Sequence, residues 1–300
     1  MIRLGMIDFD TSHVVEFTKR INHIDIAEDQ WVEGAKVVAG VPGVSLIMPE
    51  RVPGYTAAMK KYGIEILDDP AQLFGKIDAV MIEANDGSVH RERAMPFIER
   101  GIPVFVDKPF ACSVDDARTM LRAAMEKHVP LMSCSSLRYA AGLADARAGK
   151  GPAGDLLGAF TYGPAPLHPR NPGLFHYGIH PVELLFTLMG TGCTKVNCTF
   201  TEGAEVATGV WSDGRVAGIR GIRAGKQDYG FTMFGAKGVV TQGIDTKYGY
   251  RDMLKAVITM FETKESPIDP RETLEIVAFI EAAKASADAG GASIPLKAGL

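Results

Sequence analysis

The stretch GMIDFDTSH, Gly5 to His13, follows a short apolar opening and precedes a helix-like stretch. An apolar strand, a tight turn and a helix in this order begin a dinucleotide-binding unit, whose turn ordinarily carries the glycine fingerprint G-x-G-x-x-G. Here Asp8 and Asp10 stand at or near the first two glycine positions, and His13 stands at or near the third. The stretch therefore predicts how the fold begins and raises the question of whether the chain binds a dinucleotide.

The first half of the chain continues this pattern by alternating short apolar runs with helical patterns. Such alternation is typical of strand and helix units over a parallel sheet. Right-handed crossovers turn it into a doubly wound sheet, whose ligand crevice lies at the carboxyl ends of the strands. We expect strands at residues 2–7, 35–39, 77–83, 103–106 and 129–132, and helices at residues 89–100 and 114–127.

The pattern changes past Arg138. Residues 152–173 are rich in Gly and Pro, which predicts a strand leading into a long loop. Stretches with a period of two residues follow, and the Asp-Gly turn at residues 213–214 indicates a hairpin between two of them. We expect helices at residues 182–189 and 270–288 and strands at residues 195–202, 205–211, 215–222 and 230–234.

These patterns predict an α/β protein with two domains, and 300 residues are more than one average domain needs. Residues 1–134 are expected to form a Rossmann-like dinucleotide-binding domain with a doubly wound parallel sheet. Residues 135–300 are expected to form an α+β domain with an open, mostly antiparallel sheet.

Composition argues against several kinds of partner. The net charge of -4 comes from 32 basic and 36 acidic residues scattered along the chain, so we expect no nucleic-acid partner. No apolar run is long enough to span a bilayer and the N-terminus lacks signal-peptide features, which predicts a cytoplasmic protein without a membrane partner. The four cysteines form no C-x-x-C pair, so we expect them to be reduced and mostly structural.

Two stretches carry candidate chemical groups. Lys108, in VFVDKPF, follows an apolar strand directly, so its amine would emerge at the strand's carboxyl end, although an ordinary surface lysine would show the same pattern. His176 and His180 are four residues apart, near the start of a helix that Pro181 suits. They could be catalytic, could be structural, or could bind a metal with Glu183 as a third ligand.

A third stretch places polar groups above the same crevice. The run from Asn85 to Ser88 follows a buried-looking strand and opens a helix. His90 falls in the first turn of that helix, where a capping role competes with chemistry.

In their order and spacing, these stretches resemble the Gfo/Idh/MocA oxidoreductases, the family of glucose-fructose oxidoreductase and inositol dehydrogenase. Asp107-Lys108-Pro109 resembles the family's Glu-Lys-Pro motif, and HYGIH, residues 176–180, is similar to its Asp-x-Gly-x-His motif. His90 and Glu92 resemble the H-x-E-x-A helix, and Arg138 lies where the family has an arginine. The resemblance covers nearly the whole chain.

The resemblance implies hydride transfer between NAD or NADP and a carbon of a sugar or polyol-like substrate. Lys108 would hydrogen-bond the reacting hydroxyl, and His180 would take its proton, with His176 beside them. Association into a homodimer or homotetramer through the C-terminal sheet is implied as well, and no metal is assigned. The expected cofactor-binding residues are Asp8, Asp10, Thr11, Ser12, His13, Asn85, His90, Asp107 and Lys108; those for substrate are Lys108, Arg138, His168, Arg170, Asn171, His176 and His180.

The chain departs from the family pattern on the cofactor's side. Besides the altered glycines, the end of the second strand, VVAGVPG, has no Asp, Glu or Arg to hold a ribose, and His176 replaces the family's Asp. Two alternatives therefore stay open. One is a metal-assisted lyase, isomerase or hydrolase acting on a sugar-like substrate. The other is a non-catalytic sugar-binding protein on an enzyme fold.

Overall fold

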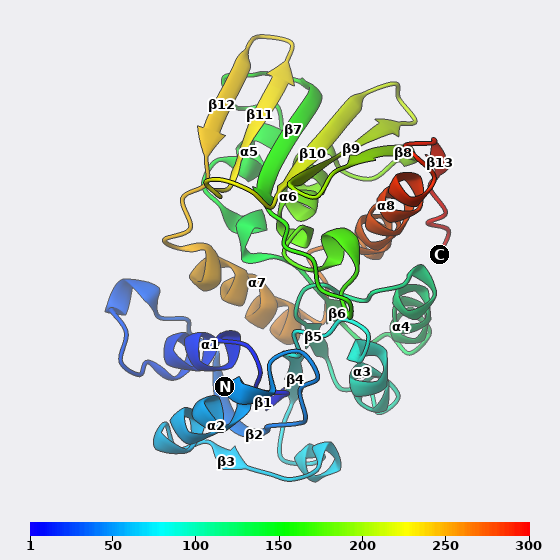
Figure 1. The fold of residues 1–300 in the computed structure, drawn as a ribbon. Helices are drawn as coiled ribbons and strands as arrows, with labels where there is room; N and C mark the ends of the chain where they lie inside the picture. Colours follow the sequence, from blue (N-terminus) through cyan, green and yellow to red (C-terminus); the bar gives the residue numbers. More distant parts are fainter. The chain divides into compact units, whose positions relative to one another are not determined.

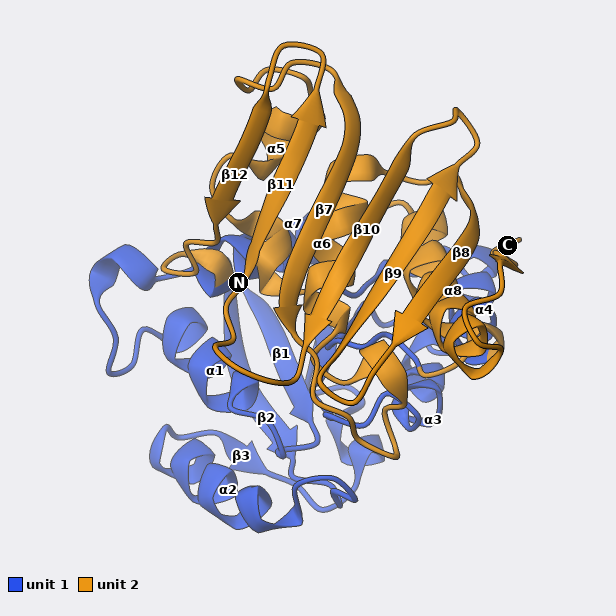
Figure 2. Cartoon of the chain, turned by 45° about the horizontal axis from the view of Figure 1, so that its top comes forward, with its two compact units in different colours: residues 1–111, 116–134, 250–268 blue, residues 112–115, 135–249, 269–300 orange.

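The computed structural model describes residues 1–300, which form two compact units (Figure 2). Unit 1 consists of residues 1–111, 116–134 and 250–268, and unit 2 of residues 112–115, 135–249 and 269–300. The chain contributes residues 112–115 to unit 2 and enters that unit again after residue 134. It returns to unit 1 for residues 250–268, so unit 1 is not one continuous segment.

Unit 1 is built on a six-stranded parallel sheet in the order β3-β2-β1-β4-β5-β6 (Figure 1). The strand order reverses between β1 and β4, as in a doubly wound fold, which confirms the predicted fold class. The strands are β1 (Ile2–Ile7), β2 (Ala35–Val41), β3 (Glu65–Ile66), β4 (Ala79–Ile82), β5 (Val104–Val106) and β6 (Leu131–Met132). The helices are α1 (His13–Asn22), α2 (Val52–Lys61), α3 (His90–Ile98), α4 (Val114–Glu126) and α7 (Gly249–Thr263).

Burial explains why β1 and α1 form where they do. Leu4, Met6 and Ile7 are fully buried, as expected for a central parallel strand covered on both faces. In α1, Val14, Phe17 and Ile21 recur at helical spacing and are buried, so one face of the helix packs inward. The turn between β1 and α1 is thereby fixed at the carboxyl edge of the sheet.

Unit 2 is built on a seven-stranded mixed sheet in the order β12-β11-β7-β10-β9-β8-β13 (Figure 1). Only the pair of β7 and β10 is parallel, so the sheet is mostly antiparallel, as predicted. The strands are β7 (Leu156–Pro164), β8 (Cys193–Phe200), β9 (Ala204–Trp211), β10 (Val216–Ile222), β11 (Gly230–Gly235), β12 (Val239–Gly243) and β13 (Ile294–Pro295). The helices α6 (Ile179–Met189) and α8 (Pro270–Asp288) pack on this sheet, and α5 (Leu143–Arg147) is one short turn beside α6.

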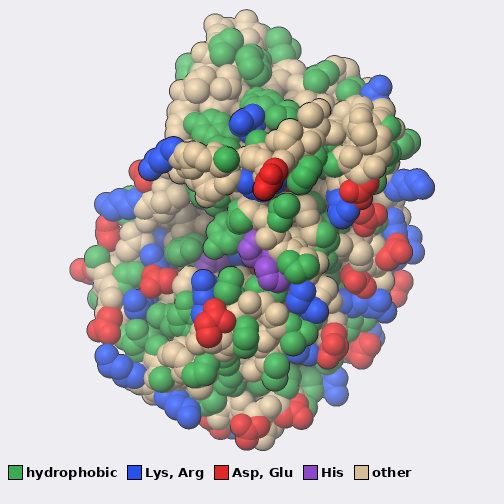
Figure 3. All heavy atoms as spheres, viewed as in Figure 1, with side chains coloured by type: hydrophobic (Ala, Val, Ile, Leu, Met, Phe, Trp, Pro, Cys, Tyr) green, Lys and Arg blue, Asp and Glu red, His purple; other side chains and the backbone are tan.

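Short 3₁₀ segments connect several of these elements. They are Glu28–Gln30, Pro49–Arg51, Pro70–Leu73, Ser136–Tyr139 and Gly173–Phe175. None of the helices has the length and apolar character needed to cross a membrane. Acidic and basic side chains are interspersed on the face drawn in Figure 3, in keeping with their scatter along the sequence.

Candidate functional site

The turn after β1 keeps the shape of a glycine turn although it contains no glycine. Asp8 has φ 66°, the left-handed conformation that glycine adopts without strain and that aspartate tolerates better than most residues. The amides of Asp8 and Phe9 donate to the carbonyls of Val41 and Pro42, which ties the turn to the end of β2. The backbone path expected of the first fingerprint glycine is therefore present, with a carboxylate added to it.

The Asp8 carboxylate is buried against the end of β2. A side chain at Gly43 would meet this carboxylate, so the two positions fit together only because residue 43 is glycine. Arg93, on α3, donates its Nε–H to Asp8 Oδ2 at 3.1 Å, while Oδ1 has no hydrogen-bond partner. Burial raises the pKa of Asp8 to about 6, although the Arg93 charge acts in the opposite direction.

Asp10 links three loops at the edge of the sheet. Its Oδ1 accepts from the backbone N–H of Asn85 at 2.9 Å, and its Oδ2 accepts from the Ser45 hydroxyl at 2.6 Å. The Asn85 side-chain amide donates to the Asp10 carbonyl at 2.8 Å. Asp10 is only 2% exposed, and its carboxylate joins the loops that follow β1, β2 and β4.

His13 begins α1 and lies in a chain of polar side chains. Its Nδ1 is 2.7 Å from Asp107 Oδ2, and its Nε2 is 3.1 Å from the Tyr250 hydroxyl. Lys108 Nζ lies 3.6 Å from the same Asp107 oxygen, and the lysine side chain is 14% exposed. Although burial opposes ionisation of Asp107, the His13 and Lys108 charges hold its pKa below its usual range.

Glu83 lies directly after β4 and is fully buried. Neither of its carboxylate oxygens has a hydrogen-bond partner. Burial and the Asp107 charge raise the pKa of Glu83 well above its usual range, with Lys108 acting against them. One donor atom from each of His13, Glu83 and Asp107 lies within 4.8 Å of the other two.

The remaining predicted cofactor residues lie in the turn itself and at the start of α3. Thr11 Oγ1 accepts from the His13 backbone N–H at 3.3 Å, and Ser12 is the exposed N-cap of α1. His90 is fully buried, with Nε2 2.9 Å from the Ala84 carbonyl and Nδ1 2.9 Å from the Pro109 carbonyl. Its ring therefore joins the loop after β4 to the loop that carries Lys108.

In unit 2, the histidines of the HYGIH stretch lie at the start of α6. His180 Nδ1 is 2.7 Å from the Ser135 hydroxyl, and the His180 ring contacts those of Tyr177 and Tyr229. The His176 ring lies 5.2 Å from the His168 ring. The structure therefore brings the predicted substrate residues His168 and His176 together.

The predicted residues Arg170 and Asn171 lie on the loop that carries His168. The Arg170 amide donates to His168 Nδ1 at 3.2 Å, and residues 168 and 171 pair as an isolated bridge. The Cys112 thiol donates to Asn171 Oδ1 at 3.2 Å, and Asn171 is buried. These contacts fix the shape of the loop.

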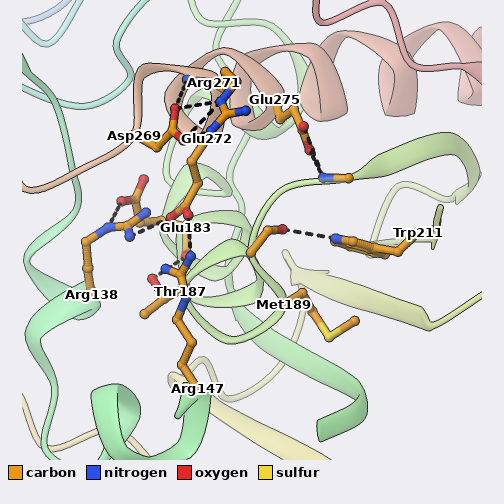
Figure 4. A network of polar contacts seen from close by, with 12 residues as sticks. Arg138, Arg147, Glu183, Thr187, Met189, Trp211, Asp269, Arg271, Glu272 and Glu275 are labelled. Atoms are coloured by element: carbon orange, nitrogen blue, oxygen red, sulfur yellow. Dashed lines mark hydrogen bonds and ion pairs between the residues drawn. The ribbon is translucent and has the colours of Figure 1, made fainter. Parts of the chain in front are cut away.

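Arg138 and Glu183 belong to a buried ion-pair network in unit 2 (Figure 4). Arg138 contacts Glu183 Oε1 and Glu272 Oε1, both at 2.6 Å, and Arg147 contacts Glu272 Oε2 at 3.0 Å. Burial raises the pKa of Glu183, while Arg138 opposes that change. The Glu183 carboxylate is thus engaged by an arginine, and the structure does not bring it together with His176 and His180 as a metal-binding group.

Sequence reasoning did not single out Glu83, Arg93, Ser135 or Tyr250. Of these, Glu83 left a readable signal, because an acidic residue directly after the apolar run AVMI is unusual for a buried strand end. Arg93, Ser135 and Tyr250 have no comparable signal in the sequence, and only their tertiary contacts identify them as site residues.

The geometry of the turn after β1 can be compared with what a bound dinucleotide requires. The left-handed conformation at residue 8 keeps the tight turn of the fingerprint, and α1 keeps its helix N-terminus. These two features fit a pyrophosphate. The carboxylates of Asp8 and Asp10 are directed into protein contacts, which reduces their repulsion of phosphate oxygens. The usual acidic ribose partner is absent from the end of β2, where Gly43 faces Asp8.

Comparison with known proteins gives one family match. Residues 40–134 match the model of the Gfo/Idh/MocA oxidoreductase family with an NAD-binding Rossmann fold, the family that the sequence resembles. A 1,5-anhydro-D-fructose reductase of Ensifer adhaerens is 32% identical over 114 residues. This stretch is 37% of the present chain and 34% of the reductase, so the match spans about a third of the relative's length.

Solved structures match over nearly the whole chain. A myo-inositol dehydrogenase from Corynebacterium glutamicum superposes with a TM-score of 0.80 at 16% identity, covering 99% of each chain. The WlbA dehydrogenase from Bordetella pertussis, solved with NADH and UDP-GlcNAcA, gives 0.79 at 20% identity, covering 99% of this chain and 98% of that one. At these identities the likeness shows a shared fold.

Proposed function

Because residues 40–134 carry the NAD-binding Rossmann fold of the Gfo/Idh/MocA oxidoreductases, we propose that this chain is an NAD(P)-dependent oxidoreductase acting on a sugar or polyol-like substrate. The observation that carries the proposal is the position of Lys108. This lysine follows β5 at the carboxyl edge of the parallel sheet, where such folds bind ligands, and its amine lies 3.6 Å from Asp107.

The turn after β1 and the neighbouring loops would hold the cofactor. When bound, the dinucleotide would supply the acceptor or donor of a hydride. The α1 N-terminus would face its phosphates, and the loops joined by Asp10 would keep the turn rigid. The residues proposed for this role are Asp8, Asp10, Thr11, Ser12, His13, Asn85, His90, Asp107 and Lys108.

The proposed chemistry assigns different tasks to a lysine and a histidine. Lys108 donates a hydrogen bond to the reacting hydroxyl and stabilises the negative charge that develops on its oxygen. His180 accepts the hydroxyl proton, and the Ser135 hydroxyl at its Nδ1 orients the ring. His176, half-buried beside His168, assists at the substrate.

A polyhydroxyl substrate suits the polar loop of unit 2. His168 and Arg170 provide donors and acceptors on one short stretch of chain, whose shape the buried Asn171 supports, and a sugar needs several such groups. Arg138 is only 8% exposed and is paired with two carboxylates, so we propose that it acts on substrate indirectly, by fixing its surroundings.

We further propose a homodimer or homotetramer formed through one face of the unit 2 sheet. Phe231 is buried, while Phe234, Val216 and Val239 are apolar and 45%, 57% and 65% exposed. Apolar side chains exposed on a sheet are typical of a surface that a second subunit covers. The four cysteines are all free, which favours a reducing compartment such as the cytoplasm.

The test is a turnover screen of wild type and Lys108→Met with sugars and polyols, following reduction of NAD or NADP by absorbance. We expect Lys108→Met to lower kcat by about 10² to 10⁴-fold, because the reacting hydroxyl loses its hydrogen-bond donor. Lys127→Met, at an exposed lysine of the same unit, is the control and should match wild type. Equal turnover in wild type and Lys108→Met would contradict the proposed role.

A further inference from the structure

We propose that His13, Glu83 and Asp107 bind a divalent first-row transition-metal ion inside unit 1. The three residues come from separate parts of the chain: the first residue of α1, the residue after β4 and the residue after β5. One donor atom of each lies within 4.8 Å of the other two, and all three side chains are buried. The fold therefore gathers one imidazole and two carboxylates at one point.

Glu83 supplies the observation that points to a ligand. It is 0% exposed, and both of its oxygens lack a hydrogen-bond partner. A buried carboxyl group without partners is costly, and native proteins ordinarily satisfy such a group with an ion or a bound water. Because a Glu83 oxygen belongs to the cluster with His13 and Asp107, a cation there would satisfy it directly.

The distances suit one ion held by three ligands. His13 Nδ1 and Asp107 Oδ2 are 2.7 Å apart, so a metal bound by both would replace the proton that they share. A cation with donors at roughly 2.0–2.2 Å keeps neighbouring donors about 3 to 3.5 Å apart, so side-chain movements on the order of 1 Å would complete the set. The Tyr250 hydroxyl at His13 Nε2 would orient the imidazole in the manner of an outer partner.

The donor set indicates the class of ion. Ca²⁺ and Mg²⁺ prefer oxygen donors throughout, whereas one imidazole with two carboxylates suits Zn²⁺, Mn²⁺, Fe²⁺ or Co²⁺. Lys108 lies 3.6 Å from Asp107 Oδ2 and opposes a cation. The two carboxylates balance the charge of a divalent ion, so the ion can bind beside Lys108. The positive charge of the lysine lowers the affinity for the ion.

The experiment titrates chelator-treated, dialysed full-length protein with ZnCl₂ by calorimetry and with CoCl₂ by visible absorption, in the absence of nicotinamide and sugar. We expect one ion per chain and no comparable binding of Mg²⁺ or Ca²⁺. Glu83→Gln keeps the shape of the side chain and should weaken Zn²⁺ binding on the order of 100-fold or more. His128→Asn, at an exposed histidine of unit 1, should bind Zn²⁺ as wild type does.

A second variant separates loss of binding from loss of fold. His13→Asn removes the nitrogen donor, and thermal melting of each metal-free variant shows whether it is folded. Loss of binding in folded Glu83→Gln and His13→Asn supports the site. Absence of Zn²⁺ and Co²⁺ binding at millimolar concentration, or unchanged affinity in both variants, would overturn it, and neither result depends on the proposed redox reaction.

Discussion

Buried charges are arranged differently in the two units, and the difference separates structural groups from candidate functional ones. In unit 2, Arg138 contacts the carboxylates of Glu183 and Glu272, and Arg147 contacts Glu272 from a second direction (Figure 4). In unit 1, neither carboxylate oxygen of Glu83 has a hydrogen-bond partner, and the buried Asp8 has a left-handed backbone.

The physical reason lies in the free energy of desolvation. A buried carboxylate is tolerable when a cation and hydrogen bonds replace its water, as in the unit 2 network. A buried carboxylate without such partners destabilises the folded state, and groups of this kind gather where a ligand or a reaction needs them. We therefore interpret the ion pairs of Arg138 in unit 2 as structural. We interpret the cluster of His13, Glu83 and Asp107 in unit 1 as a candidate functional site.

Loss of Arg138 should destabilise the protein more than the other substitutions considered below. Arg138→Met should lower the free energy of unfolding by about 3–5 kcal/mol, because Glu183 and Glu272 would keep their burial and lose their shared partner. Denaturant unfolding measures the change. Arg147→Met is the control, since Arg147 is 46% exposed and its loss should cost less than about 1 kcal/mol. Similar losses in both variants would show that the network is not organised around Arg138.

A second test concerns pH dependence in unit 1. The pKa of Asp8 is about 6 in the folded protein against an ordinary value of 3.8, so between these pH values the folded state holds a proton that the unfolded chain releases. The contribution of Asp8 to stability therefore falls as pH rises from about 4 to 6, by about 3 kcal/mol. Asp8→Asn should remove this fall, since asparagine also tolerates the left-handed conformation.

Urea unfolding at a series of pH values would check the Asp8 prediction. Asp78→Asn is a useful contrast, because Arg3 lowers the pKa of Asp78 to about 2. Its contribution is present above about pH 4 and is lost as pH falls toward 2, a change in the opposite direction that is reduced by solvent exposure. An unchanged pH profile in Asp8→Asn would mean that the buried carboxyl does not carry the effect.

A smaller loss of stability is expected at Asp10, whose carboxylate is hydrogen-bonded although it is buried in unit 1. Ser45→Ala removes the hydroxyl that donates to Asp10 Oδ2 at 2.6 Å and should destabilise the protein by about 1–2 kcal/mol. Thr201→Ala, at an exposed neutral hydrogen bond to the Ala204 carbonyl, should cost less. Thermal unfolding measures the loss of stability in each variant. Equal losses would contradict a stabilising role for the hydrogen bond between Ser45 and Asp10.

Much of the fold could be predicted from the sequence because local signals agreed with the tertiary structure. The strand at residues 2–7 and the helix at residues 270–288 were predicted with the bounds that β1 and α8 show. In α8, Asp269 accepts from the Arg271 N–H and Pro270 occupies the first turn, so the start is encoded by residue type.

The helices α2 and α7 were not predicted from the sequence. The helix α2 contains Pro53 and Gly54 and buries only Met59, so its sequence shows no apolar stripe. The helix α7 was not predicted although Met253, Val257 and Phe261 recur at helical spacing and are buried. Its return to unit 1 is a tertiary property that periodicity alone does not reveal.

The candidate site was predicted less completely than the fold. Asp8, Asp10 and His13 could be found because they replace glycines in a recognisable turn. Their partners could not, since the contact of Asp8 with Arg93 joins residues 85 positions apart in the chain. The isolation of Glu83 is likewise visible only once the surroundings of the side chain are known.

We propose that the turn from Asp8 to His13 is a rebuilt phosphate loop. Calorimetric titration of cofactor-free protein with NAD⁺, NADH, NADP⁺ and NADPH tests it most directly, after denaturation and mass analysis have shown that no nucleotide co-purifies. We expect saturable binding of at least one dinucleotide at micromolar affinity. Absence of binding by all four at millimolar concentration would contradict it.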